Sequence, residues 1–148
     1  MRPCTPSSEI MPSSLPDGAV AGLVAGTLSG LPSTAIALLR GEDPLEATRA
    51  AGALLFPAET RTSRLLAGAV PVHLGLSLGW GVVLDRLLPR RRAVGLGALA
   101  GLGIAALDLG SVGRRYPRIR SLRPLPQIVD HIAFGTLAGL VLSRRRAG

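Results

Sequence analysis

Six polar residues sit within or at the ends of long apolar stretches, where an ionisable group is costly and usually functional. Four of them are ionisable and two carry hydroxyls: His73, Asp108, Asp130, His131, Ser33 and Thr34. Carboxylates beside imidazoles can relay protons or ligate a divalent metal. These residues therefore form the candidate site, provided that the chain brings them together.

Four apolar stretches must position these residues, and each is predicted to be a membrane-spanning helix. A hydrocarbon core of about 30 Å needs roughly 20 apolar residues at 1.5 Å per residue. The expected spans cover residues 18–39, 65–84, 93–112 and 125–143. The sequence thus predicts an all-α membrane protein, with four transmembrane helices in a tightly packed bundle.

Two further segments complete the expected organisation of the chain. Residues 1–17, rich in proline and serine, are predicted to be a disordered tail, and Met11 is an alternative start. Between the first two spans, Asp43, Pro44 and Glu46 resemble a helix start. A short interfacial helix is therefore expected at about 43–56, with a re-entrant dip as the alternative.

Alternating span directions place the six polar residues in the same half of the membrane. At least three interpretations of this convergence stay open. The cluster handles protons or a solute; or His73, Asp130 and His131 ligate a metal; or the contacts are structural. In the structural case His73 bonds a carbonyl freed by a kink, and the aspartates pair with loop arginines: Arg114, Arg115 and Arg123.

Charge favours membrane headgroups as partners over nucleic acid. The net charge is +8, and all 17 basic residues are arginines that gather between the apolar stretches. Eight lie on the face that holds both termini and nine on the other. This near balance fits a dual topology, but the dense runs at 90–92 and 144–146 favour termini in the cytoplasm of a cell-membrane protein.

Glycines recur at four-residue spacing in every span, a pattern typical of close helix contacts in lipid. They are Gly18, Gly22, Gly26, Gly30, Gly75, Gly79, Gly97, Gly101, Gly135 and Gly139. Pro32 and Pro71 lie inside spans and predict kinks, or a helix broken to line a cavity. Trp80 and Tyr116 are expected to anchor at the membrane interface.

The stretches AGLVAGTLSGLPSTAIALLRGEDPLEATRAAGALL and VDHIAFGTLAGLVL resemble small four-helix membrane proteins of high-GC bacteria. That resemblance implies no particular activity. The first span lacks the embedded glutamate of small multidrug transporters, and the late spans lack the Thr- and Phe-rich motif of fluoride channels.

No enzyme motif is present, and neither a cofactor nor a resident metal is expected. The predicted function is a structural or accessory subunit, acting as a homo-oligomer or with another membrane protein. The alternative is a small transporter or channel that uses the His/Asp cluster.

Overall fold

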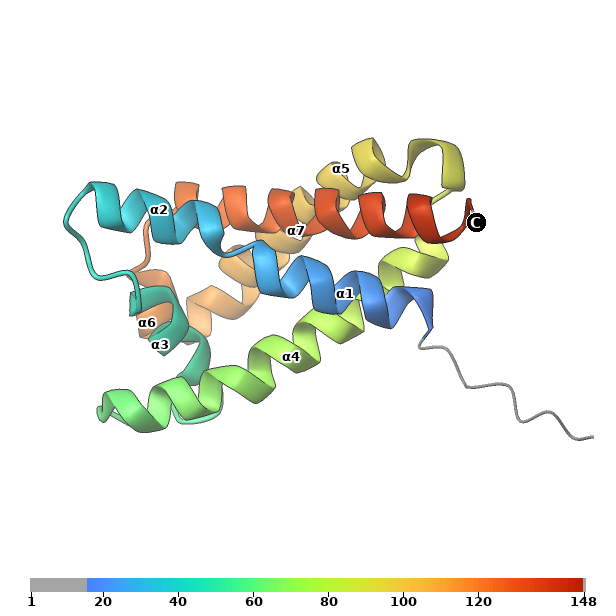
Figure 1. Ribbon diagram of the computed structural model, residues 1–148. Coiled ribbons are helices and arrows are strands. Elements are labelled where there is room, and N and C mark those ends of the chain that lie inside the picture. The colour runs from blue at the N-terminus through green and yellow to red at the C-terminus, as the bar shows by residue number, and fades with distance from the viewer. Residues whose placement is uncertain (1–15, 148) are drawn as a thin grey trace, which may run out of the picture.

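The computed structural model describes residues 16–147, apart from the side chain of Arg90. The predicted tail therefore falls almost wholly outside the described residues, although α1 already begins at Asp17. The described part is helical, without strands. Its α-helices, labelled in Figure 1, are α1 (Asp17–Leu28), α2 (Leu31–Leu39), α3 (Glu46–Gly52), α4 (Thr62–Leu87), α5 (Ala93–Leu107), α6 (Pro117–Arg120) and α7 (Pro124–Arg145).

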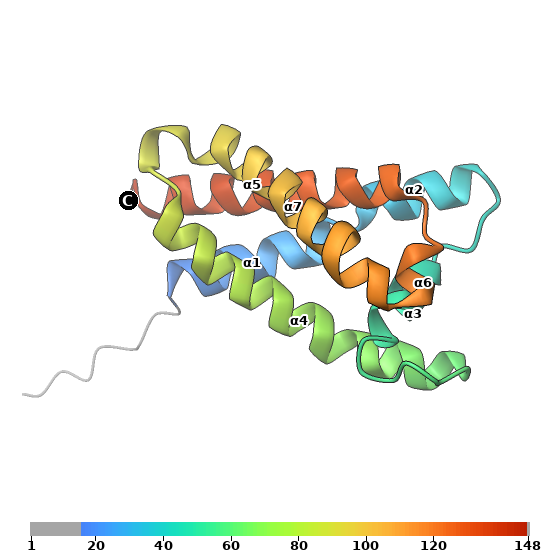
Figure 2. The ribbon, with the colours of Figure 1, turned by 180° about the vertical axis from the view of Figure 1, so that it is seen from behind.

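Four helical segments are long and apolar enough to cross a bilayer, as the sequence predicts. They are Asp17–Leu39, Thr62–Leu87, Ala93–Arg115 and Pro124–Arg145. Several extend past the predicted ends, because a helix continues through charged residues such as Arg64 and Arg86 that end the apolar stretch. The four long segments alternate in direction (Figures 1 and 2).

The first of these segments is broken in the middle rather than merely kinked. α1 ends at Leu28, and α2 begins at Leu31 with Pro32 in its first turn. Proline has no N–H, so it fits the start of a helix better than its interior. The break leaves backbone groups near Gly30 in need of partners inside an apolar region.

α2 ends at Leu39, and Gly41 then directs the chain toward α3. Gly41 adopts φ +66, and the N–H of Glu42 donates to the carbonyl of Ala37 at 2.9 Å. This is the Schellman arrangement that glycine favours. α3 is shorter than the predicted 43–56 helix, because the Asp43 carboxylate accepts the N–H of Leu45 at 2.8 Å. That bond closes a turn where the helix was expected to start.

The third segment changes its winding near its end. α5 continues into a π-helical turn at Asp108–Val112 and a 3-10 turn at Gly113–Arg115. A π turn inserts an extra residue per turn and is frequent at functional sites. Asp108 is the first residue of this turn.

The helices pack as two close pairs, α1 with α4 and α5 with α7, joined through α1 and α7. In the α5–α7 pair, a Cβ added at Gly97, Gly101, Gly135 or Gly139 would fall on a backbone carbonyl of the other helix. The two backbones therefore touch, as small residues in lipid permit.

The α1–α4 pair uses a different set of small residues from the predicted one. Gly18, Gly22 and Gly26 of α1 face α4, where a Cβ at Gly18 would lie 2.8 Å from the Cα of Val82. The small residues that α4 presents are Ser77 and Gly81. A Cβ at Gly75, Gly79 or Gly30 would meet nothing within 4 Å, so these three glycines are not at a helix contact.

Ion pairs join the ends of different long segments at each end of the bundle, as expected when consecutive spans run in opposite directions. At one end Arg145 bonds Asp17 at 2.7 Å, and Arg146 bonds Asp85 at 2.5 Å. At the other end Arg123 lies 3.3 Å from Glu42. The two predicted faces are thus the two ends of the bundle, while their orientation in a membrane stays a prediction.

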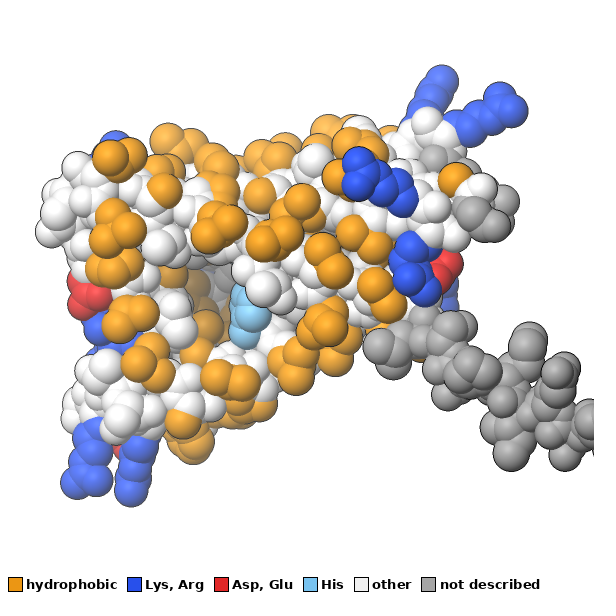
Figure 3. Space-filling model, viewed as in Figure 1, with side chains coloured by type: hydrophobic (Ala, Val, Ile, Leu, Met, Phe, Trp, Pro, Cys, Tyr) orange, Lys and Arg blue, Asp and Glu red, His pale blue; other side chains and the backbone are white. Residues whose placement is uncertain are grey.

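Packing is uneven along the bundle. The buried apolar cluster includes Ala21, Leu84, Ala93, Ala138 and Leu142, all toward the end that holds the termini. Many large apolar side chains are exposed, and Leu39 is 87% accessible. In Figure 3 apolar side chains spread over the middle and arginines gather at the ends, a surface that suits lipid.

Candidate functional site

A cavity of about 600 Å³ occupies the other half of the bundle, toward α2, α3 and α6. Figure 3 shows this hollow, with a histidine side chain in it. All six candidate residues line it, on four different segments of the chain: Ser33, Thr34, His73, Asp108, Asp130 and His131. The expected convergence of these residues is therefore present in the structure.

Asp130 on α7 caps the start of α2. Its Oδ1 accepts the backbone N–H of Ser33 at 2.9 Å. The N–H groups in the first turn of a helix lack partners within the helix and carry partial positive charge, which stabilises a carboxylate there. Because Asp130 belongs to another helix, this bond ties the break in the first segment to α7.

His131 and Asp108 form a pair that holds one exchangeable proton. The Nδ1 of His131 lies 2.7 Å from the carbonyl of Gln127, so Nδ1 must carry a hydrogen, because a carbonyl only accepts. Its Nε2 lies 3.0 Å from Oδ2 of Asp108. The shared proton is on Nε2 or on the carboxyl; either way the pair is neutral and can exchange a proton with a third group.

His73 on α4 reaches across to α1. Its Nε2 lies 2.8 Å from the carbonyl of Gly26 and donates to it. This carbonyl lies four residues before Gly30, where the helix breaks, so the histidine serves a backbone group in the last turn of α1. Such a carbonyl partner matches one part of the structural interpretation of His73.

The cluster is not one continuous network. Thr34 Oγ1 and Ser33 Oγ both donate to the carbonyl of Gly30, at 2.8 and 3.3 Å. Within residues 16–147, no His, Cys, Asp and Glu side chains form a group of three that could hold a metal. The metal interpretation through His73, Asp130 and His131 therefore has no support from these positions.

The predicted pairing of Asp108 and Asp130 with loop arginines is wrong, because no ion pair among the described residues joins either aspartate to an arginine. Asp108 pairs with His131, and Asp130 is held by a backbone N–H. Arg123 pairs with Glu42 instead. The two aspartates face the cavity, whereas the guanidinium group of Arg123 lies at the end of the bundle. The acids and this arginine are therefore at different depths along the bundle.

Apolar residues that the sequence did not assign to a site also line the cavity, among them Trp80, Ile104 and Phe134. Trp80, expected to be an interfacial anchor, packs against the buried cluster beside Ile104 and Phe134. The available signal was spacing: Trp80 lies seven residues after His73, which places both on one face of α4.

A smaller cavity of about 280 Å³ lies outside the first, near α2, α3 and α6. The two share Ser33, Pro44, Ala47, Leu122 and Gln127. Carboxylates from Glu42, Asp43 and Glu46 line the outer cavity, together with Arg123. Because it shares lining residues with the inner cavity and lies at the end of the bundle, we call it the entrance region.

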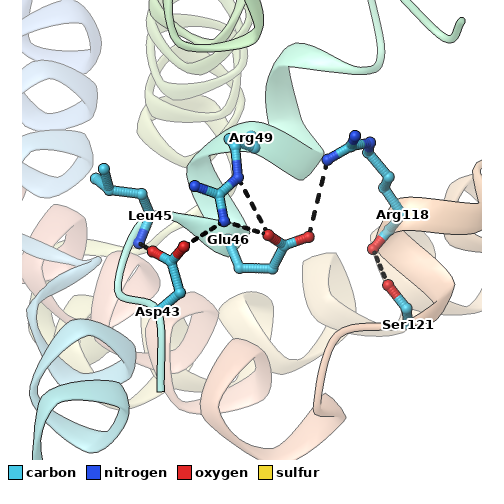
Figure 4. A network of polar contacts seen from close by, with 6 residues as sticks. All are labelled: Asp43, Leu45, Glu46, Arg49, Arg118 and Ser121. Carbon is cyan, nitrogen blue, oxygen red and sulfur yellow. Dashed lines mark hydrogen bonds and ion pairs between the residues drawn. The ribbon is translucent and has the colours of Figure 1, made fainter. Parts of the chain in front are cut away.

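Ion pairs surround this entrance, and one of them joins α3 to α6 (Figure 4). Arg49 bonds Asp43 and Glu46, each at 2.5 Å, and Glu46 also lies 3.9 Å from Arg118 of α6. The guanidinium of Arg49, together with the N–H of Leu45, lowers the pKa of Asp43 below its ordinary value of 3.8. The N–H groups of Arg61 and Thr60 and the side chain of Arg64 lower that of Glu59, against a smaller opposing effect of burial.

These lowered pKa values predict that the entrance loosens in acid. A carboxyl with a depressed pKa in the folded state stabilises the fold above its ordinary pKa and loses this effect as pH falls through the folded value. Amide hydrogen exchange over residues 43–61, corrected for intrinsic rates, should be faster at about pH 3 than at about pH 6. Arg49→Met should weaken the pH dependence near Asp43 and keep it near Glu59, whereas equal protection of the wild type at both pH values would contradict the prediction.

The fold and site together are compatible with a multi-pass membrane protein: four apolar helices of spanning length contribute to an open, mainly apolar cavity that also holds a few ionisable side chains. No protein-family model, curated protein or solved structure matches the chain. Any function must therefore be argued from the site itself.

Proposed function

We propose that the protein is a small transporter or channel that handles protons or a small solute in its intramembrane cavity. The observation that carries this proposal is the cavity of about 600 Å³, lined by Asp130 and by the His131–Asp108 pair. Ionisable side chains at membrane depth usually face such a cavity and mark a transport pathway.

The broken first segment also supports this proposal. Discontinuous helices near the middle of a bilayer commonly build transport sites, because their free backbone ends line a cavity. Here the start of α2 lines the cavity and is held by Asp130. A proton that neutralises Asp130 weakens its hold on the Ser33 N–H, which links protonation to the position of α2.

Proton flux through reconstituted protein tests the proposal. Liposomes that enclose a pH-sensitive dye and carry a potassium diffusion potential should acidify or alkalinise faster with protein than without it. Asp130→Asn should lower the rate by about tenfold or more, in line with general effects of proton-transfer groups. Asparagine keeps the oxygen that accepts the Ser33 N–H, so the fold is expected to survive.

The matched control is Asp17→Asn, the same change at a carboxylate in the end ion pair with Arg145. It should leave the flux unchanged. Wild-type flux no higher than that of empty liposomes would reject the proposal, as would an Asp130→Asn variant that conducts like the wild type.

A second candidate function is an accessory subunit, and one observation favours it. Gly75 and Gly79 lie on a side of α4 where an added Cβ meets open space, so this small-residue face is available to another helix. Apart from Gly30, the other predicted packing glycines contact helices of the same chain. An accessory subunit should show no flux on its own, so the liposome experiment separates the two candidates.

A further inference from the structure

The groups that line the inner cavity make it suitable for a positive charge. None of its lining residues is an arginine, although the chain has 17 basic residues. The His131–Asp108 pair is neutral as a unit, and His73 uses its Nε2–H on a backbone carbonyl. Asp130 is then the one lining carboxylate without a side-chain cation among the described ion pairs. The cavity thus carries a net negative charge when Asp130 is ionised.

The remaining lining is mainly apolar and partly aromatic, with a few hydroxyl groups and the amide of Gln127. Trp80, Ile104 and Phe134 lie on three different helices around the cavity, with Leu54 and Leu76 nearby. A volume of about 600 Å³ lies within the range of roughly 300–1,000 Å³ that drug-sized ligands occupy. Aromatic faces also attract cations, most strongly that of tryptophan.

We propose that the cavity binds a drug-sized organic cation with an apolar body, and that Asp130 is its counter-charge. This inference rests on the proposed function and names its substrate class. The apolar body displaces water from the Trp80 and Phe134 surfaces, while the cationic centre lies near the carboxylate of Asp130. An anion of the same size is excluded, because no lining arginine compensates its charge.

The entrance region fits the same ligand. The outer cavity shares five lining residues with the inner one, and three of its side chains are carboxylates against one guanidinium. Arg49 and Arg118 pair with these carboxylates and neutralise part of their negative charge. The entrance therefore does not repel a cation, whereas the arginine-rich ends elsewhere on the bundle would.

Proton and cation compete for Asp130. When a proton binds the carboxylate, the electrostatic attraction is lost and the cation leaves; when the cation binds, the proton is released. The groups that face Asp130 are the Ser33 N–H from α2, His131 on its own helix, Asp108 from the π turn and His73 from α4; α3 contributes no charged lining residue.

Trp80 provides the readout, since it is the single tryptophan of the chain and lines the cavity. The probe is tetraphenylphosphonium, titrated into purified full-length protein in a nonionic detergent with excitation at the red edge of tryptophan absorption. Tetraphenylborate, nearly identical in shape and opposite in charge, is the matched ligand control. We expect saturable quenching by the cation and none by the anion.

Variants locate the bound cation. Asp130→Asn should weaken the apparent affinity at least about tenfold, as expected for removal of one member of a buried charge pair. Asp17→Asn should bind like the wild type. Gly30→Leu adds a side chain beside the cavity and should also weaken binding, while Gly103→Leu, which meets open space away from the cavity, should not. Circular dichroism and gel filtration establish that each variant is folded.

The pH dependence is the last arm of the test. The affinity of the wild-type protein for tetraphenylphosphonium should fall about tenfold for each unit by which the pH decreases, over the range in which Asp130 is protonated. Asp130→Asn should show a much weaker dependence of this affinity on pH. Equal binding of both ions, wild-type affinity in Asp130→Asn, or no quenching by the cation would each overturn the inference. If proton flux persists without cation binding, the substrate class is wrong and the proposed function stands; cation binding without any flux rejects transport instead.

Discussion

Replacing Gly101 by leucine should prevent α5 and α7 from forming their close pair, with a loss of about 3 kcal/mol in the free energy of unfolding. A Cβ at Gly101 would fall on the carbonyl of His131, with Ile132 Cα at 2.9 Å. The obstacle is backbone of the facing helix, which cannot rotate away as a side chain can. The two helices must therefore separate, and the dispersion contacts that hold helices together in lipid are lost.

Gly103→Leu is the matched control, because it makes the same change two residues later in the same helix. A Cβ at Gly103 meets nothing within 4 Å. Both variants gain helix propensity and hydropathy to the same degree, so a difference between them reports packing alone. Thermal unfolding in detergent, followed by circular dichroism, measures it. Equal midpoints for Gly101→Leu and Gly103→Leu would contradict the α5–α7 contact.

The spans were predictable from the sequence because each rests on a property of the chain itself. An apolar stretch of about 20 residues has few alternatives to a helix, so the four segments lie close to the predicted bounds. The prediction that the polar residues lie at the same depth in the membrane followed from the alternating directions of the four spans. Side-chain partners were not predictable, because they depend on helix rotation, which an apolar sequence with little asymmetry does not specify.

The glycine faces show this dependence on rotation most clearly. α4 contains glycines at positions 75, 79 and 81, and the four-residue spacing of the first two suggested the contact face. The structure instead uses Ser77 and Gly81, which have the same spacing and lie about 200° around the helix from the predicted residues. Serine is as acceptable as glycine at such a contact, so two registers were available in the sequence.

The break at Gly30 and the π turn at Asp108 were the least accessible features. Pro32 predicted a local disturbance, yet the extent of the break depends on whether Asp130 and His73 are present to satisfy the freed backbone groups. Nothing local distinguishes the π turn from a continued α-helix. Both deviations are in the cavity wall, where tertiary contacts override the local preference of the chain.

Asp108→Leu should destabilise the protein by about 1–3 kcal/mol and abolish proton flux, because it leaves Nε2 of His131 without its partner at 3.0 Å. Asp108→Asn separates these two effects. The asparagine amide can donate to Nε2 of a neutral His131, while Nδ1 still donates to the Gln127 carbonyl. This variant should unfold like the wild type and still fail to conduct protons, since the shared proton is gone.

The double variant Asp108→Leu with His131→Phe tests whether the pair is needed for folding at all. Replacing both partners of a buried pair by apolar groups is often neutral, whereas removing one is costly. The double variant should therefore regain most of the stability lost in Asp108→Leu, as judged by thermal unfolding, and remain inactive in the liposome assay. If Asp108→Asn retains full proton flux, then the pair serves only to hold α7 against the π turn, and the proton path must run through Asp130 without it.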